Sequence, residues 1–154
     1  MGETWKPLSE DSRYEVSDLG RARKNGKLKK LTKNRRGYLH TAINSKVQGV
    51  HQLVLKTFKP NPVPSFYDRV DHINQNQLDN RLENLRWSNA TLNQWNCDKR
   101  KGFKKHKSGR YESRMFLEGK YIYLGTFASE AAAKARYLEA IADARQVYDP
   151  YPIY

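Results

Sequence analysis

The sequence predicts an α+β protein built from small modules. Segments that alternate apolar and polar residues, typical of strands, lie in the first 44 residues, and more lie near the C-terminus. The clearest helical segment covers residues 129–148. Short strands combined with a small number of helices indicate the mixed α+β class. The proline-rich stretch at 59–65, "KPNPVPS", is expected to be an extended connector, because proline interrupts both helices and central strands.

The N-terminal segment is predicted to contain strands, a tight turn and one helix. Residues 13–19 and 37–44 alternate as strands do. Between them, Asn25-Gly26 suits the positive φ angles of a two-residue hairpin turn. A short helix is predicted at 50–58 from apolar residues at helical spacing, namely Val50, Leu53, Val54 and Phe58.

The centre of the chain is predicted to run as strand, loop, strand and helix. Residues 69–73 ("RVDHI") and 84–88 ("NLRWS") have the composition of short strands, and an Asn/Gln/Asp-rich loop joins them. A helix is expected at 90–97, with Ser88 or Asn89 as its N-cap.

The C-terminal segment is predicted to contain a linker, two strands and the long helix. Residues 98–109 are basic and glycine-punctuated, and Glu118-Gly119 marks the turn between the two strands. Ser129 is the expected N-cap of the helix. The stripe on this helix at three- and four-residue spacing is expected among Ala132, Ala135, Arg136, Leu138, Ile141 and Ala142.

Positive charge is concentrated in two blocks. The 154 residues carry a formal net charge of +13. Residues 21–60 hold twelve basic and no acidic residues, and 98–125 hold nine basic and three acidic ones, whereas 61–97 is nearly neutral. Clustered Lys and Arg are typical of a polyanion binder, so nucleic acid is the expected partner. Two other interpretations are weaker: a merely soluble basic surface, and an anionic membrane surface, for which no long basic amphipathic helix is evident.

Composition excludes several other classes. Cys97 is the only cysteine, so neither an intramolecular disulfide nor a four-cysteine zinc site can form. No apolar run approaches the ~18 residues that a membrane span needs, and the N-terminus does not resemble a signal peptide. We therefore expect an intracellular protein without a membrane partner.

The near-neutral centre contains candidate metal ligands and a candidate base. Asp71 offers a hard carboxylate oxygen, and His72 can exchange a proton near neutral pH. Asn89 and Asn93 are four residues apart on the predicted helix, and their amides offer neutral oxygen ligands. A carboxylate plus an amide, with positions left for water and phosphate, suits Mg²⁺. Taken alone, an Asp-His pair is more often part of a capped turn.

The full spacing of this region resembles the HNH endonuclease family, in its phage and intron-encoded homing branch. The resemblance lies in "VDHINQNQLDNRLENLRW" followed by Asn93. It implies a ββα-metal nuclease unit at 61–98, with His72 as general base and Asp71 and Asn93 as ligands of Mg²⁺ or Mn²⁺. It also implies that Asn84 ties the loop and orients the histidine, and that structural zinc is absent.

The flanking segments resemble DNA-binding modules. Residues 1–60 resemble the modular segment that often precedes such nuclease units, in which His51 is expected to hold the core or touch DNA. Residues 99–154, with "YLGTF" before an alanine-rich helix, resemble the Apetala-type DNA-binding domain of plant transcription factors, a three-stranded sheet backed by one helix. Candidate DNA-binding residues are Arg21, Arg23, Lys29, Lys30, Arg35, Arg36, Arg86, Lys104, Lys105, His106, Arg110 and Arg114.

These observations predict a metal-dependent, site-specific DNA endonuclease of the homing type. It is expected to nick double-stranded DNA as a monomer, inside a bacterial or phage-infected host. One alternative is a sequence-specific DNA-binding regulator with an inactive nuclease unit. Another is an RNA-binding protein that stacks bases on Tyr111, Tyr121 and Tyr123, although these tyrosines are expected to pack within the small sheet and its helix.

Overall fold

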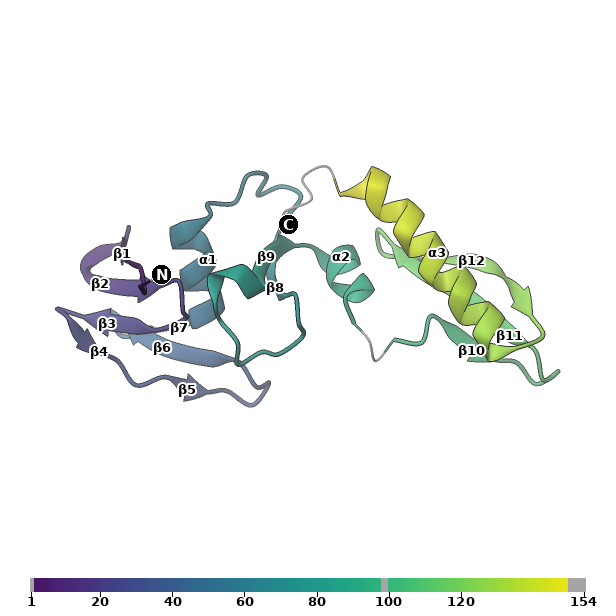
Figure 1. Cartoon of the computed structure of the whole chain (residues 1–154), viewed down its shortest axis with the longest axis horizontal. Helices are drawn as coiled ribbons and strands as arrows, with labels where there is room; N and C mark the ends of the chain where they lie inside the picture. The colour runs from purple at the N-terminus through teal and green to yellow at the C-terminus, as the bar shows by residue number, and fades with distance from the viewer. Residues whose placement is uncertain (1, 98–99, 150–154) are drawn as a thin grey trace. The chain divides into compact units, whose positions relative to one another are not determined.

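The computed structural model describes residues 2–97 and 100–149. The chain divides into two compact units, which we call the N-terminal unit (Met1–Asn89) and the C-terminal unit (Ala90–Tyr154). Both units combine small sheets with helices, so the predicted α+β class is confirmed (Figure 1). The expected three-part division at 60/61 and 98/99 stays a prediction about functional modules.

The N-terminal unit contains three small antiparallel sheets. A four-stranded sheet has the order β1-β2-β3-β4, a three-stranded sheet has the order β5-β6-β7, and β8 pairs with β9. The strands at 13–19 and 37–44 were predicted, whereas β1, β5 and β7 were not. The strands are β1 (Trp5–Leu8), β2 (Asp11–Ser17), β3 (Ala22–Lys24), β4 (Lys27–Leu28), β5 (Thr32–Lys33), β6 (Leu39–Ile43), β7 (Lys46–Gly49), β8 (Arg69–His72) and β9 (Leu85–Ser88).

The helix α1 (Val50–Phe58) lies at the centre of the N-terminal unit, as its apolar spacing predicted. It packs against strands of all three sheets (Figure 1). The core includes Val50, Leu53, Val54 and Leu55 from this helix, with Val16, Ile43, Tyr67 and Leu85 around it. The predicted hairpin turn is also confirmed, since Asn25 and Gly26 have φ angles of 47° and 76° between β3 and β4.

The proline-rich connector leads from α1 to β8. It is not extended throughout, because the amide of Tyr67 donates to the carbonyl of Val63 and closes a turn. The indole Nε1 of Trp87, on β9, donates to the carbonyl of Lys59 at 2.8 Å. This bond ties the β8–β9 hairpin to the C-terminal end of α1. The short 3-10 helix η1 (Leu82–Asn84) leads into β9.

The C-terminal unit contains α2 (Ala90–Trp95), a three-stranded antiparallel sheet and the long helix α3 (Glu130–Tyr148). The helix runs along one face of the sheet (Figure 1). Ser129 caps it, and its side chain accepts a hydrogen bond from the amide of Ala132. The sheet consists of β10 (Phe103–Lys105), β11 (Tyr111–Leu117) and β12 (Lys120–Phe127).

The three-stranded sheet with one helix that the family resemblance implied for this unit is confirmed, but three expectations drawn from the residues were wrong wholly or in part. β10 lies within the segment taken as a linker, because pairing with β11 orders it. Of the stripe expected on α3, Ile141 is buried but the other five residues are not; the buried face consists of Ala133, Tyr137, Ala140 and Ile141, and Leu138 is 53% exposed. Tyr137 sets this face: a Cβ on Gly102 would lie 2.1 Å from its ring, so Gly102 makes room for it. Tyr121 and Tyr123, expected to be packed, are 57% and 63% exposed.

No helix in the described part of the chain is both long and apolar enough to cross a membrane.

Candidate active site

Asp71 and His72 occupy the end of β8 and are both buried, with 7% and 4% of their surface exposed. The strand pairs with β9, where Asp71 lies opposite Arg86 and His72 opposite Leu85. Burying a carboxylate and an imidazole side by side costs free energy unless other groups compensate. The contacts of these two residues therefore decide what the site can do.

The ring of His72 is held by Asn80, a residue that the sequence analysis did not single out. Nε2 of His72 lies 3.0 Å from the side-chain oxygen of Asn80, which is itself only 3% exposed. The amide nitrogen of Asn80 donates to the carbonyl of Leu78 at 3.4 Å, so its oxygen faces the imidazole. The only signal in the sequence was the large number of Asn and Gln side chains in the 74–84 loop, and it did not show which of them contacts the histidine.

A second histidine and a tyrosine surround the other side of the ring. The ring centroids of His51 and His72 are 5.3 Å apart, and Tyr38 lies 5.0 Å from His51 and 5.8 Å from His72. Burial lowers the pKa of His51 to about 4, helped by the charges of His72 and His40. His51 is therefore a neutral core residue, and its buried Nδ1 has no hydrogen-bond partner among the residues that the structure describes.

Asn84 ties down the loop between the two strands. Its side-chain oxygen accepts from the amide of Asn74 at 2.9 Å, and its nitrogen donates to the carbonyl of Asp79 at 2.7 Å. The carboxylate of Asp79 binds Arg81 and the side chain of Asn74, and the Arg81 hydrogen bond is the main cause that lowers the pKa of Asp79 to about 2. Because both ends of the loop are bonded, its residues keep a defined position beside His72.

Asp71 is engaged by Arg86 in the structure. Nε and Nη2 of Arg86 donate to the same carboxylate oxygen, Oδ2, at 3.0 and 2.9 Å. Within residues 2–97 and 100–149, no cluster of three or more His, Cys, Asp or Glu side chains could hold a metal ion. A cation at this site would therefore need amide oxygens, water or phosphate beside the carboxylate of Asp71. That mixed oxygen set fits Mg²⁺, which normally keeps several waters.

The amides of the predicted metal site are divided between the two units. Asn89 is buried at the end of the N-terminal unit, whereas Asn93 is exposed on α2 in the C-terminal unit. The pairing of Asn93 with Asp71 stays a prediction.

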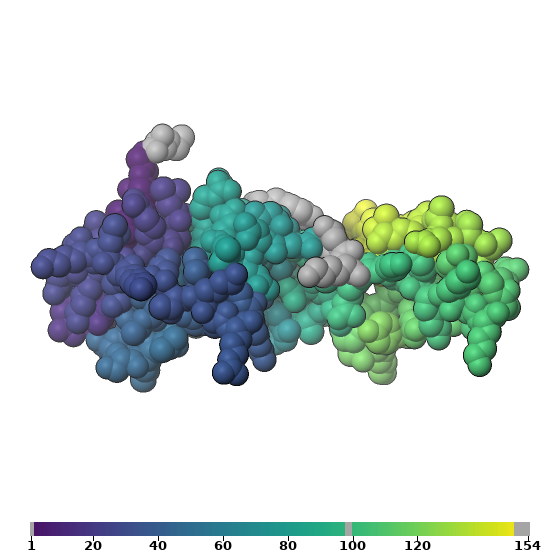
Figure 2. All heavy atoms as spheres, turned by 90° about the horizontal axis from the view of Figure 1, so that it is seen from below, coloured from purple at the N-terminus to yellow at the C-terminus, as the bar shows by residue number. Residues whose placement is uncertain are grey.

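The predicted DNA-binding residues of the N-terminal unit differ in how far their charge is compensated. Arg23 forms two hydrogen bonds with Glu15, Arg21 pairs with Glu3, and Arg86 pairs with Asp71. The remaining cations predicted here lie on the surface or over an aromatic ring, and none of the ion pairs found in the described residues involves them. They are Lys29, whose ammonium lies over Tyr14, and the exposed Lys30, Arg35 and Arg36. Figure 2 shows that the dark blue segment around residues 30–40 projects from the face in view.

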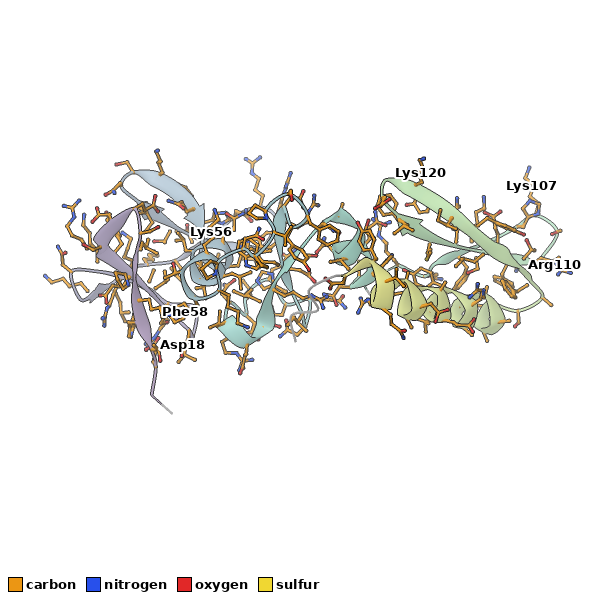
Figure 3. All side chains as sticks on the ribbon, turned by 90° about the horizontal axis from the view of Figure 1, so that it is seen from above. Asp18, Lys56, Phe58, Lys107, Arg110 and Lys120 are labelled. Atoms are coloured by element: carbon orange, nitrogen blue, oxygen red, sulfur yellow. The ribbon has the colours of Figure 1, made fainter. Side chains whose placement is uncertain are left out.

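The cations of the C-terminal unit gather around β10 and the turn that follows it. Lys107 and Arg110 point outward from the turn between β10 and β11 (Figure 3). Lys104 and Arg114 lie near Glu112, at 3.6 and 3.9 Å, which compensates part of their charge. Lys105 and His106 are exposed. The sequence therefore predicted cations on this surface, but it did not show which of them form ion pairs.

Comparisons with known proteins match the two parts of the N-terminal half separately. Residues 3–44 match the NUMOD4 motif, and residues 48–94 match the family described as HNH endonuclease. These two segments contain Tyr38, Asp71, His72, Asn80, Asn84 and Asn93. Both matches end before residue 95, so the resemblance of residues 99–154 to the Apetala-type domain stays a prediction.

Individual relatives agree with these family matches. Two uncharacterized HNH endonucleases of Acanthamoeba polyphaga mimivirus, L247 and L245, are each 36% identical, over 99 and 95 residues. Those alignments cover 59% and 58% of this chain but only 25% and 28% of the viral proteins.

A solved structure of the HNH homing endonuclease I-HmuI, concerned with that enzyme's DNA binding and cleavage, aligns with a TM-score of 0.51. It is 28% identical and covers 60% of this chain and 56% of the I-HmuI chain. The chain therefore carries a NUMOD4 motif followed by an HNH endonuclease domain.

Proposed function

We propose that this protein is a metal-dependent, site-specific DNA endonuclease of the homing type. The observation that carries the proposal is a buried His72, bonded to Asn80 and adjacent to Asp71, within the segment that matches the HNH endonuclease family. The likeness to I-HmuI, a DNA-cleaving protein, supports DNA as the substrate. The clustered cations of both units support binding to the phosphate backbone.

His72 acts as the general base in this proposal. It takes a proton from the water that attacks the phosphodiester, as a general base does. The water oxygen displaces the 3′ oxygen in line, which leaves a 5′-phosphate and a 3′-hydroxyl, as the family resemblance implies. Asn84 contributes by holding the loop beside the base.

Asp71 and Asn93 would hold Mg²⁺, or Mn²⁺ in its place. When bound, the divalent cation would stabilise negative charge on the pentacovalent phosphate and on the leaving oxygen. In this proposal Arg86, which donates to Asp71 in the structure, also helps to clamp the scissile phosphate.

We further propose that the protein nicks one strand as a monomer. Each chain has a single Asp71-His72 pair, which can serve one scissile phosphate at a time. The two cationic regions differ from each other, so one chain can grip an asymmetric site. In this proposal residues 99–154 bind duplex DNA as an Apetala-type module.

A second candidate function is a DNA-binding regulator whose nuclease site is inactive. The Arg86–Asp71 ion pair favours it, because a guanidinium on the carboxylate opposes the binding of another cation. The two candidates differ in whether DNA is cut, since both bind it.

A plasmid assay separates the candidates. Supercoiled plasmid carrying the target site is incubated with the full chain, with and without Mg²⁺ or Mn²⁺. We expect open circles well before linear molecules, no product with a chelator, and one chain per DNA in sedimentation. Binding without cleavage at every metal concentration would favour the regulator. Linear product without a nicked intermediate, from a complex with two chains, would contradict the monomeric nickase.

A further inference from the structure

The hydrogen bond between His72 and Asn80 defines which ring nitrogen of His72 carries the proton. A neutral imidazole has one N–H and one lone pair, and the bond made by one nitrogen sets the role of the other. Nε2 of His72 faces the side-chain oxygen of Asn80 at 3.0 Å, and that oxygen can only accept. Nε2 must therefore donate, which leaves the lone pair on Nδ1.

Asn80 is itself oriented by its surroundings. Its side-chain nitrogen donates to the carbonyl of Leu78, so a flipped amide would lose this bond and face a ring N–H with an N–H. Asn80 is 3% exposed, and burial removes water as an alternative partner for its amide.

The N-terminal segment supports Asn80 from behind. Gly20 has a φ angle of +80°, and a Cβ built on it would lie 2.8 Å from both the Cβ and the carbonyl oxygen of Asn80. The carbonyl of Asp18 accepts a hydrogen bond from the amide of Leu82 at 2.7 Å. The turn around Gly20 lies within the NUMOD4 match, and it contacts the backbone of the loop that carries Asn80.

We propose that Asn80 is a positioning residue that holds His72 as the Nε2–H tautomer, with Nδ1 as the atom that accepts the proton, and that Gly20 keeps Asn80 in place. The role of Nδ1 in the reaction rests on the proposed nuclease function, whereas the tautomer does not. A segment expected to bind DNA thereby becomes a support of the catalytic histidine.

The tautomer is measured directly by ¹⁵N NMR of the histidine side chains, on the full chain without metal or DNA, at a pH where imidazoles are neutral. The His72 signals are assigned by their loss in His72→Gln. We expect the Nε2–H pattern in the native protein and in Asn80→Asp, because a carboxylate also accepts from Nε2. In Asn80→Leu, which has a similar size but no acceptor, we expect a mixture of tautomers.

In this proposal the rate of DNA cleavage depends on the tautomer of His72. Asn80→Leu should lower kcat by roughly 10–100-fold, as removal of outer supports of site residues typically does, with DNA affinity changed by less than a few-fold. Asn80→Asp should retain most of the activity. If Asn80 had only a structural role, Asn80→Asp and Asn80→Leu would not differ in both the His72 tautomer and the cleavage rate.

Gly20→Ala tests the support without altering any side chain of the site. Gly26→Ala is its matched control, because Gly26 also has a positive φ, +76°, but nothing lies within 4 Å of its Cβ position. We expect Gly20→Ala to disturb the His72 tautomer and to slow cleavage, and Gly26→Ala to leave both unchanged.

An Nδ1–H tautomer in the native protein would overturn the proposal, as would equal tautomers and rates for Asn80→Leu and Asn80→Asp. If Asn80→Leu does not fold, two other results would overturn the proposal. One is loss of the Nε2–H tautomer of His72 in Asn80→Asp, and the other is an equal effect of Gly20→Ala and Gly26→Ala on the tautomer and the cleavage rate. If the tautomers behave as expected but the native protein cuts no DNA, the nuclease function fails while the positioning of His72 by Asn80 stands.

Discussion

The two units of this protein differ in what they bury. Of the polar residues buried in the described chain, two lie in the C-terminal unit, Thr91 and Ser113. The N-terminal unit buries the others, namely Ser17, Thr41, His51, Asp71, His72, Asn80, Asn84, Ser88 and Asn89. Because a buried polar group costs free energy unless it is well bonded, such a concentration is more typical of a site for chemistry than of a core.

The C-terminal unit has the opposite arrangement. Its core consists mainly of apolar side chains such as Met115, Ala133 and Ile141, while its cations and the tyrosines of β12 face outward. An exposed surface of this kind suits binding to a polyanion. The buried polar groups are thus concentrated in the N-terminal unit, whereas exposed cations occur in both units, and this difference can be tested at matched positions in the two units.

The largest effect is expected from His72→Ala. Loss of a general base should lower the cleavage rate by about 10²–10⁴-fold, with DNA affinity changed by only a few-fold, because His72 is not a phosphate anchor. His106→Ala is the control, since His106 is an exposed histidine of the C-terminal unit. Equal losses of binding and cleavage in His72→Ala would indicate a structural role.

A smaller effect is expected on stability in acid. The pKa of His51 is about 4 in the folded chain and about 6.5 when unfolded. Between these values the unfolded chain takes up a proton that the folded chain does not, so stability should fall as pH decreases from 6.5 to 4. The loss should reach at most about 3 kcal/mol.

Urea unfolding of the native protein and His51→Gln, at pH values across this range, checks the prediction. The variant should lack the part of the acid dependence that His51 contributes, and His106→Gln should keep it. An unchanged pH profile in His51→Gln would show that another group controls acid sensitivity.

Asn93→Ala tests whether the C-terminal unit also contributes to chemistry. It should raise the Mg²⁺ concentration for half-maximal cleavage by roughly 10-fold, because the variant has one amide oxygen ligand fewer. Asn93→His should keep part of the activity, since imidazole also binds divalent metals. Normal cleavage by Asn93→Ala at low Mg²⁺ would confine the chemistry to the N-terminal unit.

The smallest effect is expected from cations of the C-terminal unit. Replacing Lys104, Lys105 and Arg110 together with glutamine should weaken DNA binding and lower the slope of log affinity against log salt by about 0.9 for each phosphate that the variant no longer neutralises. Arg136→Gln is the control, because Arg136 lies on α3 and is paired with Glu139. An unchanged salt slope in the triple variant would remove this surface from the DNA interface.

Substitutions are preferable here to deletion of residues 99–154. The indole of Trp95, on α2, donates to the carbonyl of Phe116, and the hydroxyl of Thr91 accepts from the amide of Glu118. Deletion would remove these hydrogen-bond partners of α2 and so disturb the helix that carries Asn93.

The sequence by itself determined the elements whose signals are local. Apolar spacing predicted α1, Asn25-Gly26 predicted the hairpin turn, and Ser129 predicted the start of α3, because caps, turns and periodicity depend on neighbouring residues. The residues of the candidate site were predicted from the resemblance of one short stretch, containing Asp71, His72 and Asn84, to a family motif.

Only the tertiary structure decided the partners of these residues. That Asn80 reaches His72, that Arg86 reaches Asp71 and that Gly20 supports Asn80 depends on how separate segments pack. The buried face of α3 was misassigned for the same reason, because an alanine-rich helix shows little contrast between its faces, and Tyr137 fixes its orientation through Gly102. A sequence supplies the groups that can form hydrogen bonds, whereas packing selects which of them meet, because a hydrogen bond forms only when its two heavy atoms lie within about 3 Å.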